Sequence, residues 1–230
     1  MSSRERIPLE SSETRLSIAV RLIDTFTQQH PRRPPRVRLK DRPERFRRTA
    51  SGYLVLTDLP DSVSEVTVVA DDSPRHLRTA HVVDTLATDI DDDSSYVAEE
   101  LEIAPAPAYP FPAGTTLVRG TISEGEKRVS GAELEIDLEG ISDDDRPGFR
   151  AEGWSDARGE YVLYFQNITT DDVTDEYESG ENSNGELKSR HIHVGGQPPT
   201  VTAKHPDSGV KTSTSIPIPE GTTTSLDLSF

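Results

Sequence analysis

The residues in this sequence that could do chemistry are arginines crowded into its first fifty positions. They follow one another at short intervals: Arg32, Arg33, Arg36, Arg38, Arg42, Arg45, Arg47 and Arg48. Residues 1–50 hold 13 basic and 6 acidic residues, whereas the whole chain holds 25 and 41, for a net charge of −16. Because guanidinium groups bind carboxylates and phosphates, the run predicts a docking surface for an anionic partner.

Three interpretations of this run compete. It docks an acidic protein partner or the chain's own acidic half, it is a plain solvated face, or it binds nucleic acid. Proteins that bind single strands interleave stacking aromatics with their cations, and only Phe46 is interleaved here. We therefore expect protein partners and no nucleic acid.

Metal ligands are the next candidates. His191 and His193 lie two apart, so on a strand they share one face, as metal ligands do. Loop carboxylates at 91–93, 143–145 and 171–172 could recruit calcium, but none has EF-hand spacing. With no cysteine and no carboxylate fixed beside the histidines, we expect no metal site and no cofactor.

Catalytic patterns are missing from the sequence. It contains no G-x-S-x-G elbow, and carboxylate pairs are too abundant in an acidic chain to mark a site. We expect a non-enzyme with no catalytic residue. No apolar stretch is long enough to span a membrane, and the polar first residues do not look like a signal peptide. A cytoplasmic location is expected, or one within a particle released from the cell.

The composition indicates adaptation to salt. Acidic residues outnumber basic ones, and the basic set contains only five lysines, Lys40, Lys127, Lys188, Lys204 and Lys211. Strong self-repulsion keeps such a surface soluble once salt screens its charges. We therefore expect a halophilic, archaeal source, against the alternative of an ordinary acidic protein.

The fold class follows from many short segments of alternating polarity, among them residues 16–24, 63–70, 132–138 and 160–165. Residues 104–114 (APAPAYPFPAG) form a proline-rich linker that divides them. We predict an all-β protein of two tandem small antiparallel β-sandwiches. Its parts are a flexible tail at 1–14, a sandwich with the basic segment at 15–103, the linker, and a second sandwich at 115–230.

The two halves look like distant repeats. Thr49-Ala50-Ser51-Gly52-Tyr53-Leu54 can be aligned with Asp156-Ala157-Arg158-Gly159-Glu160-Tyr161. The alignment predicts a turn in each half, with glycine supplying a backbone conformation that other residues resist, and a tyrosine that then fills the sandwich.

The second half resembles the carboxypeptidase regulatory-like family, whose modules are transthyretin-like (prealbumin-like) sandwiches. The resemblance rests on residues 117–122 (LVRGTI), 129–134 (VSGAEL) and 155–163 (SDARGEYVL). Arg128 stands where proline is common, Ser155 replaces threonine, and an acidic insert occupies 166–187. The family implies the fold and is nearly silent on function.

The chain as a whole resembles accessory proteins encoded beside contractile phage-tail-like injection systems, on segments such as LIDTFT, SGYLVLTDLP and AYPFPAGTTLVRG. That resemblance implies a structural accessory protein that binds other proteins, with sheath, tube or baseplate components as the partners. The alternative is a free-standing module that binds carbohydrate or another surface ligand. An exposed aromatic platform would favour it, and its candidates are Trp154, Tyr177, Tyr109 and Phe111.

Overall fold

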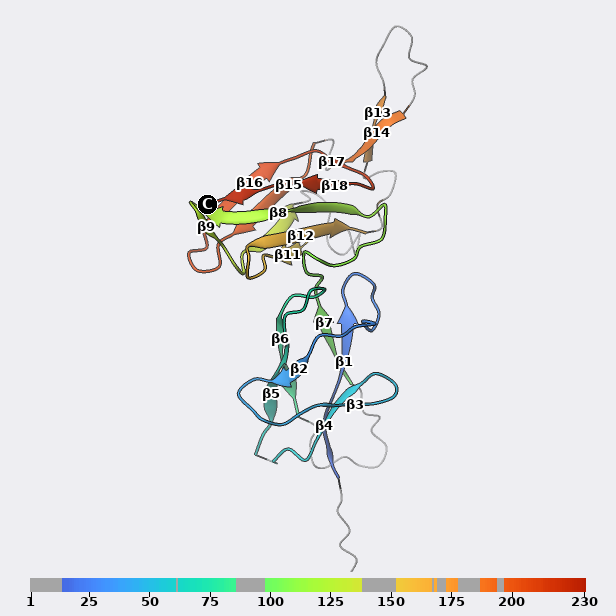
Figure 1. Cartoon of the computed structure of the whole chain (residues 1–230), viewed down its shortest axis with the longest axis vertical. Coiled ribbons are helices and arrows are strands. Elements are labelled where there is room, and N and C mark those ends of the chain that lie inside the picture. The colour runs from blue at the N-terminus through green and yellow to red at the C-terminus, as the bar shows by residue number, and fades with distance from the viewer. Residues whose placement is uncertain are drawn as a thin grey trace, which may run out of the picture. The chain divides into compact units, whose positions relative to one another are not determined.

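The computed structural model describes residues 14–60, 62–85, 98–137, 152–166, 168, 173–177, 187–193 and 197–230. Within these ranges the chain forms strands and turns and no helix, which confirms the all-β prediction (Figure 1). It divides into two compact units. Unit 1 comprises Met1–Asp72 and Arg78–Ile103, and unit 2 comprises Ser73–Leu77 and Ala104–Phe230.

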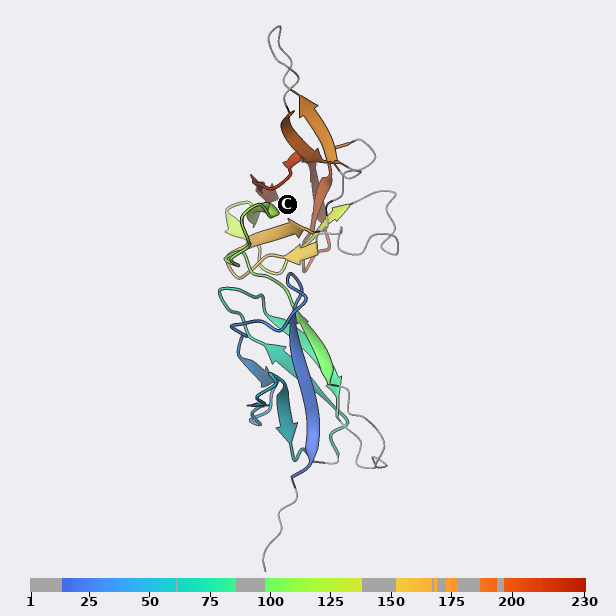
Figure 2. The same ribbon diagram turned by 90° about the vertical axis from the view of Figure 1, so that its right-hand side faces the viewer.

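Unit 1 is a sandwich of two sheets, with strand orders β3-β4-β1-β7 and β2-β5-β6 (Figure 2). Its strands are β1 (Leu16–Asp24), β2 (Val37–Leu39), β3 (Arg47–Arg48), β4 (Leu54–Thr57), β5 (Glu65–Ala70), β6 (Thr79–Asp84) and β7 (Glu99–Ile103).

The core of unit 1 lies between these two sheets. It is built from inward positions of both, including Ile18 and Leu22 of β1, Leu39 of β2 and Val68 of β5. Because strand side chains alternate between faces, the residues next to them in β2 and β5 point outward. β1 and β7 run parallel, so the sandwich is not wholly antiparallel.

Unit 2 contains a four-stranded sheet of order β11-β10-β15-β16, a five-stranded sheet of order β12-β8-β18 in which β9 and β19 also pair with β8, and a three-stranded sheet of order β13-β14-β17. Its strands are β8 (Thr116–Glu124), β9 (Lys127–Arg128), β10 (Glu133–Asp137), β11 (Glu152–Trp154), β12 (Glu160–Phe165), β13 (Val173–Tyr177), β14 (Leu187–Ile192), β15 (Thr200–Lys204), β16 (Lys211–Ser215), β17 (Ile218–Pro219), β18 (Thr223–Ser225) and β19 (Leu228–Ser229).

A single apolar cluster fills the space between the main sheets of unit 2. It includes Val118 of β8, Leu134 of β10, Leu163 of β12 and Val201 of β15, all of which are fully buried. β18 and β19 both pair with β8 in parallel. Both units are therefore β-sandwiches, as the sequence predicts.

Part of the predicted acidic insert is a strand. The insert spans 166–187, and its acidic residues 171–186 suggest a loop, but β13 lies among them and pairs antiparallel with β14. The expectation of a loop across all these residues is wrong because β13 finds a neighbouring strand despite its polar sequence. The acidic stretches at 91–93, 143–145 and 171–172, and all but the last residue of the tail at 1–14, lie outside the described residues.

The predicted repeat appears as the same hydrogen-bonded turn in both units. The amide of Thr49 donates to Tyr53, and the amide of Gly52 donates back to the Thr49 carbonyl. Asp156, Gly159 and Glu160 make the equivalent bonds in unit 2. In each turn the first side chain accepts a hydrogen from the backbone amide four residues on.

Both turn glycines have the positive φ that the alignment predicts, +90° at Gly52 and +71° at Gly159. The tyrosine expectation holds in one unit only. Tyr161 is buried in the core of unit 2, whereas its counterpart in unit 1 is Leu54 and the neighbouring Tyr53 is half-exposed.

The proline-rich segment lies within unit 2 and pairs there with Ser73–Leu77. The amide of Leu77 donates to the Ala104 carbonyl and the amide of Ala106 donates to Arg75, each at 2.8 to 2.9 Å. The buried His76 packs edge-on against the ring of Tyr109, with centroids 5.6 Å apart. The segment is thus hydrogen-bonded into a module, where the sequence alone suggests a spacer.

Candidate docking surface

The structure distributes the arginine run over the edge strands of both sheets of unit 1. Arg38 lies in β2, at the edge of the β2-β5-β6 sheet, and Arg36 immediately precedes that strand. Arg47 and Arg48 form β3, at the edge of the other sheet. The remaining members, Arg32, Arg33, Arg42 and Arg45, occupy the connecting segments. The run therefore does not form one flat face.

Three of the arginines are held by neighbours within unit 1. Arg38 donates from Nε to Asp71 at 2.9 Å, and Arg42 lies 3.5 Å from Glu44. Arg48 lies 2.7 Å from Nε2 of His30. Since arginine can only donate, Nε2 of His30 must accept, which leaves its Nδ1–H to bond the Leu22 carbonyl at 3.3 Å.

The other arginines of the run are exposed. They are Arg32, Arg33, Arg36, Arg45 and Arg47. No described residue forms an ion pair with any of these five. In a chain with 41 acidic residues, so many unpaired cations in one segment show that the charges are segregated. These side chains are the ones available to a carboxylate of another molecule.

Phe46 explains how part of this segment is fixed. Its ring packs against the core of unit 1, between the exposed Arg45 and Arg47. The core therefore anchors the chain at this point while its two neighbours face solvent.

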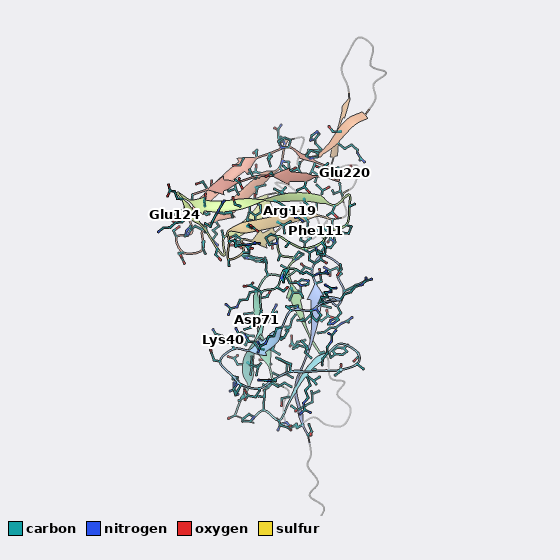
Figure 3. The ribbon with its side chains drawn as sticks, viewed as in Figure 1. Lys40, Asp71, Phe111, Arg119, Glu124 and Glu220 are labelled. Carbon is teal, nitrogen blue, oxygen red and sulfur yellow. The ribbon has the colours of Figure 1, made fainter. Side chains whose placement is uncertain are left out.

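The outer face of the β2-β5-β6 sheet adds an apolar element that the sequence does not reveal. Cross-strand pairing puts Arg38 opposite Val69, which lies opposite Ala80. One row along, Lys40 bonds through its amide to Thr67, which lies opposite Val82. We call the six side chains Arg38, Lys40, Thr67, Val69, Ala80 and Val82 the β2–β6 face. Figure 3 labels its member Lys40, together with Asp71, the partner of Arg38.

The β2–β6 face is basic along β2 and apolar along β6. The side chain of Val82 is 66% exposed, the most exposed of the large apolar residues in the described part of the chain. Val69 is fully buried although it lies on this outer face, so its neighbours close over it. Glu65 and Asp84 lie opposite each other in the next row and make that end of the face acidic. Because Arg38 is already paired with Asp71, a complementary surface would carry a carboxylate opposite Lys40 and apolar groups opposite β6.

The two candidate histidines have neighbours within the chain. Nε2 of His191 lies 2.8 Å from the hydroxyl of Ser189, and both His191 and His193 have hydrogen-bonding or electrostatic neighbours. No group of three or more metal-ligating side chains occurs among the residues the structure describes. The same part of the chain contains no helix that is long and apolar enough to cross a membrane.

Some of the aromatic candidates cluster in unit 2. The rings of Tyr109 and Phe111 are 4.8 Å apart, and Phe111 lies 5.6 Å from Tyr164. The guanidinium of Arg119 sits over Phe111 at 5.5 Å from its centroid, and burial lowers the pKa of Arg119 (Figure 3). Trp154, 44% exposed on the edge strand β11, is outside this cluster.

No family model matches the chain, and no curated protein sequence matches it. Among solved structures it is similar to the Bacillus anthracis TIE protein, at 11% identity and a TM-score of 0.27 over 94% of this chain and 34% of that one. It is also similar to the shaft pilin SpaA from Lactobacillus rhamnosus GG, at 10% identity and a TM-score of 0.22 over 80% of this chain and 68% of that one. The chain thus spans about a third of the Bacillus anthracis protein. Likenesses at this level assign no function.

Proposed function

We propose that the chain is a non-enzymatic structural protein that binds an acidic protein partner through the basic segment of unit 1. The observation that carries the proposal is the set of exposed arginines for which no described residue provides an ion pair. Arg47 lies on the edge strand β3, Arg45 and Arg47 flank the anchored Phe46, and the exposed guanidiniums are available for bidentate contact with carboxylates.

A protein is favoured over a nucleic acid because the surface combines charge with apolar area. Val82 and Ala80 continue the β2–β6 face beyond its cations, and such a mixture is typical of protein interfaces. Single-strand binding would instead require stacking rings among the arginines, and Phe46 packs into the core.

Charge reversal tests this proposal. In the triple variant Arg36→Glu, Arg45→Glu, Arg47→Glu we expect loss of binding to the partner, with an unchanged unfolding midpoint. The matched control reverses Arg78, Lys127 and Arg128, which are also exposed but lie outside the run. Equal loss of binding in both triple variants would show a non-specific charge effect and reject the docking surface.

The finer proposal is that the partner belongs to a contractile phage-tail-like particle, as a sheath, tube or baseplate component. Its support is the resemblance of the whole chain to accessory proteins of such systems. The experiment is capture of the tagged full chain from its own lysate at high salt, with mass spectrometry of the bound proteins. Capture of sheath, tube or baseplate proteins by the wild type and not by the Arg36, Arg45, Arg47 variant would support it. Their absence would reject it.

Carbohydrate or surface-ligand binding is the second candidate, and Trp154 is the observation in its favour. The ring is 44% exposed, and cross-strand pairing places it beside Glu133, which forms a 3.1 Å ion pair with Lys204. An exposed ring next to hydrogen-bonding groups suits a sugar. Because Trp154 is the chain's single tryptophan, its fluorescence reports directly on a glycan panel. Quenching that disappears in Trp154→Ala would support this function, and an unresponsive signal would reject it.

A further inference from the structure

Among the described residues, the edge strand β16 leaves a row of backbone groups without hydrogen-bond partners, although β19 of the neighbouring sheet lies close to it. β16 pairs with β15 on one side only, in a register without shifts that joins Thr200 to Ser215 and Lys204 to Lys211. The bonds from Ile216 to Pro199 and from His205 to Val210 fix which pairs exchange hydrogen bonds. Because these pairs alternate along an antiparallel ladder, Lys211, Ser213 and Ser215 point their N–H and C=O groups away from β15.

The side chains of β16 leave this edge open. The hydroxyl of Ser213 bonds that of Thr202 at 2.9 Å, and the hydroxyl of Ser215 bonds that of Thr200 at 2.8 Å. Both therefore lean over β15 and away from the open side. Exposed edges are usually protected by charges, proline, a bulge or short length. β16 has five residues, no proline and no bulge, and its one charge is Lys211 at the start.

We propose that β16 pairs antiparallel with β16 of a second copy, around a two-fold axis at Ser213. In that register Ser213 faces Ser213 of the second copy, and Lys211 faces Ser215. Lys211, Ser213 and Ser215, whose N–H and C=O groups point away from β15, are spaced symmetrically about Ser213. Each of them therefore faces a residue of the second copy with which it exchanges two N–H···O=C hydrogen bonds. The sheet β11-β10-β15-β16 thereby continues into the same sheet of the second copy.

Two further observations support a second copy as the occupant. Val210, whose side chain is 54% exposed, directly precedes β16, and the same register brings it opposite residue 216 of the second copy, an isoleucine. Ile216 is partly buried against the core of unit 2, so only its remaining exposed part is available to that valine. No carboxylate lies on β16, and its lysines do not face each other, so the local charges permit approach although each copy carries −16.

A cysteine at the axis tests the register. The chain contains no cysteine, so any disulfide comes from the introduced residue. Facing residues in a hydrogen-bonded pair have Cα atoms about 5.5 Å apart, within the about 4.4–6.8 Å that a disulfide spans. We expect Ser213→Cys to become a covalent dimer under mild oxidation. In Ser215→Cys the two cysteines would be about 14 Å apart and stay unlinked. Linking of both variants alike, or of Ser215→Cys alone, would overturn the register.

Charge at the same position tests the two-fold axis without any crosslink. Ser213→Glu and Ser213→Lys each place like charges face to face and should sediment as monomers, whereas an equal mixture should recover the dimer. Ser213→Pro removes an outward N–H that makes no bond within the sheet, so it should fold and remain monomeric. If neither the wild type nor the equal mixture forms a dimer, the proposal is wrong.

Salt separates this contact from the docking surface of unit 1. Two copies that each carry a charge of −16 repel one another. Raising the salt concentration from about 0.1 M to about 1 M shortens the screening length from about 10 Å to about 3 Å. The higher salt concentration should therefore favour the dimer. The same change should weaken arginine-mediated binding of an acidic partner. The self-association is independent of the proposed function, and sedimentation of the Arg36, Arg45, Arg47 variant should still show the dimer. A dimer that dissociates as salt rises would contradict this mode of pairing.

Discussion

Tyr161 donates its phenolic hydrogen to the backbone carbonyl of Leu226 at 2.6 Å. The ring stands in the core of unit 2, and the bond ties β12 to the segment that leads into β19. Burial raises the pKa of Tyr161, and the negative charge of Asp227 raises it further. The hydroxyl is therefore held in its neutral, donating form by its surroundings.

We expect Tyr161→Phe to lower the free energy of unfolding by about 1–3 kcal/mol at neutral pH, because the Leu226 carbonyl loses a buried donor. Since the folded-state pKa lies above the ordinary value of about 10, the stabilisation is complete below pH 10 and is lost as pH rises beyond it. Urea unfolding between pH 7 and pH 11 measures this. The wild type should lose stability above pH 10 more steeply than the variant, and parallel curves would contradict the assignment.

Gly159 meets two restrictions at once, and we expect Gly159→Ala to destabilise the chain strongly. Its φ is +71°, and an added Cβ would lie 2.9 Å from the Ile122 carbonyl oxygen and 3.0 Å from Cβ of Arg128. The positive φ alone costs about 1–3 kcal/mol. Gly209→Ala is the matched control, because its φ is +68° and nothing lies within 4 Å of the added carbon. Thermal unfolding should show a larger loss at position 159. Equal losses of stability in the two variants would mean that the neighbours of position 159 move to make room for the added carbon.

Ser155 is a buried connector between two backbone segments. Its hydroxyl donates to the Val129 carbonyl at 2.8 Å and accepts from the Ala132 amide at 2.9 Å. We expect Ser155→Ala to cost about 1–3 kcal/mol, because both groups are left unpaired in the interior. The exposed Ser130 lies nearby in sequence, and Ser130→Ala should leave the urea midpoint unchanged. A stable Ser155→Ala variant would show that water replaces the hydroxyl.

Val82 separates binding from stability. The side chain is 66% exposed, so Val82→Ser should change the free energy of unfolding by no more than about 0.5 kcal/mol. Loss of its apolar contact should weaken partner binding by about 1 kcal/mol, or roughly fivefold. Calorimetric titration that finds equal affinity for Val82→Ser and wild type would remove β6 from the docking surface.

The sequence predicts what depends on local chemistry. Alternating polarity identifies the strands, and the alignment of Gly52 with Gly159 predicts a turn whose hydrogen bonds recur in both units. These features follow from the residue and its immediate neighbours, because side-chain alternation and positive φ are properties of short segments.

Features that depend on distant partners could not be predicted in this way. Nothing in the sequence around Val82 shows that β5 places it one strand away from Lys40. Phe46 reads as one more member of a basic run until the core of unit 1 is seen to receive it. β13 lies in a polar stretch with no apolar alternation, and only its pairing with β14 makes it a strand.

The hydrogen bonds between Ser73–Leu77 and the proline-rich segment have a consequence for exchanging the modules of this protein. A fragment that starts at Ala104 would lack the strand-like stretch that pairs with Ala104 and Ala106, together with the His76 ring beside Tyr109. A fragment that ends at Ile103 would carry that stretch with nothing to pair it. The units are therefore interleaved along the chain. To transfer unit 2 to another protein, Ser73–Leu77 would have to be moved together with Ala104–Phe230.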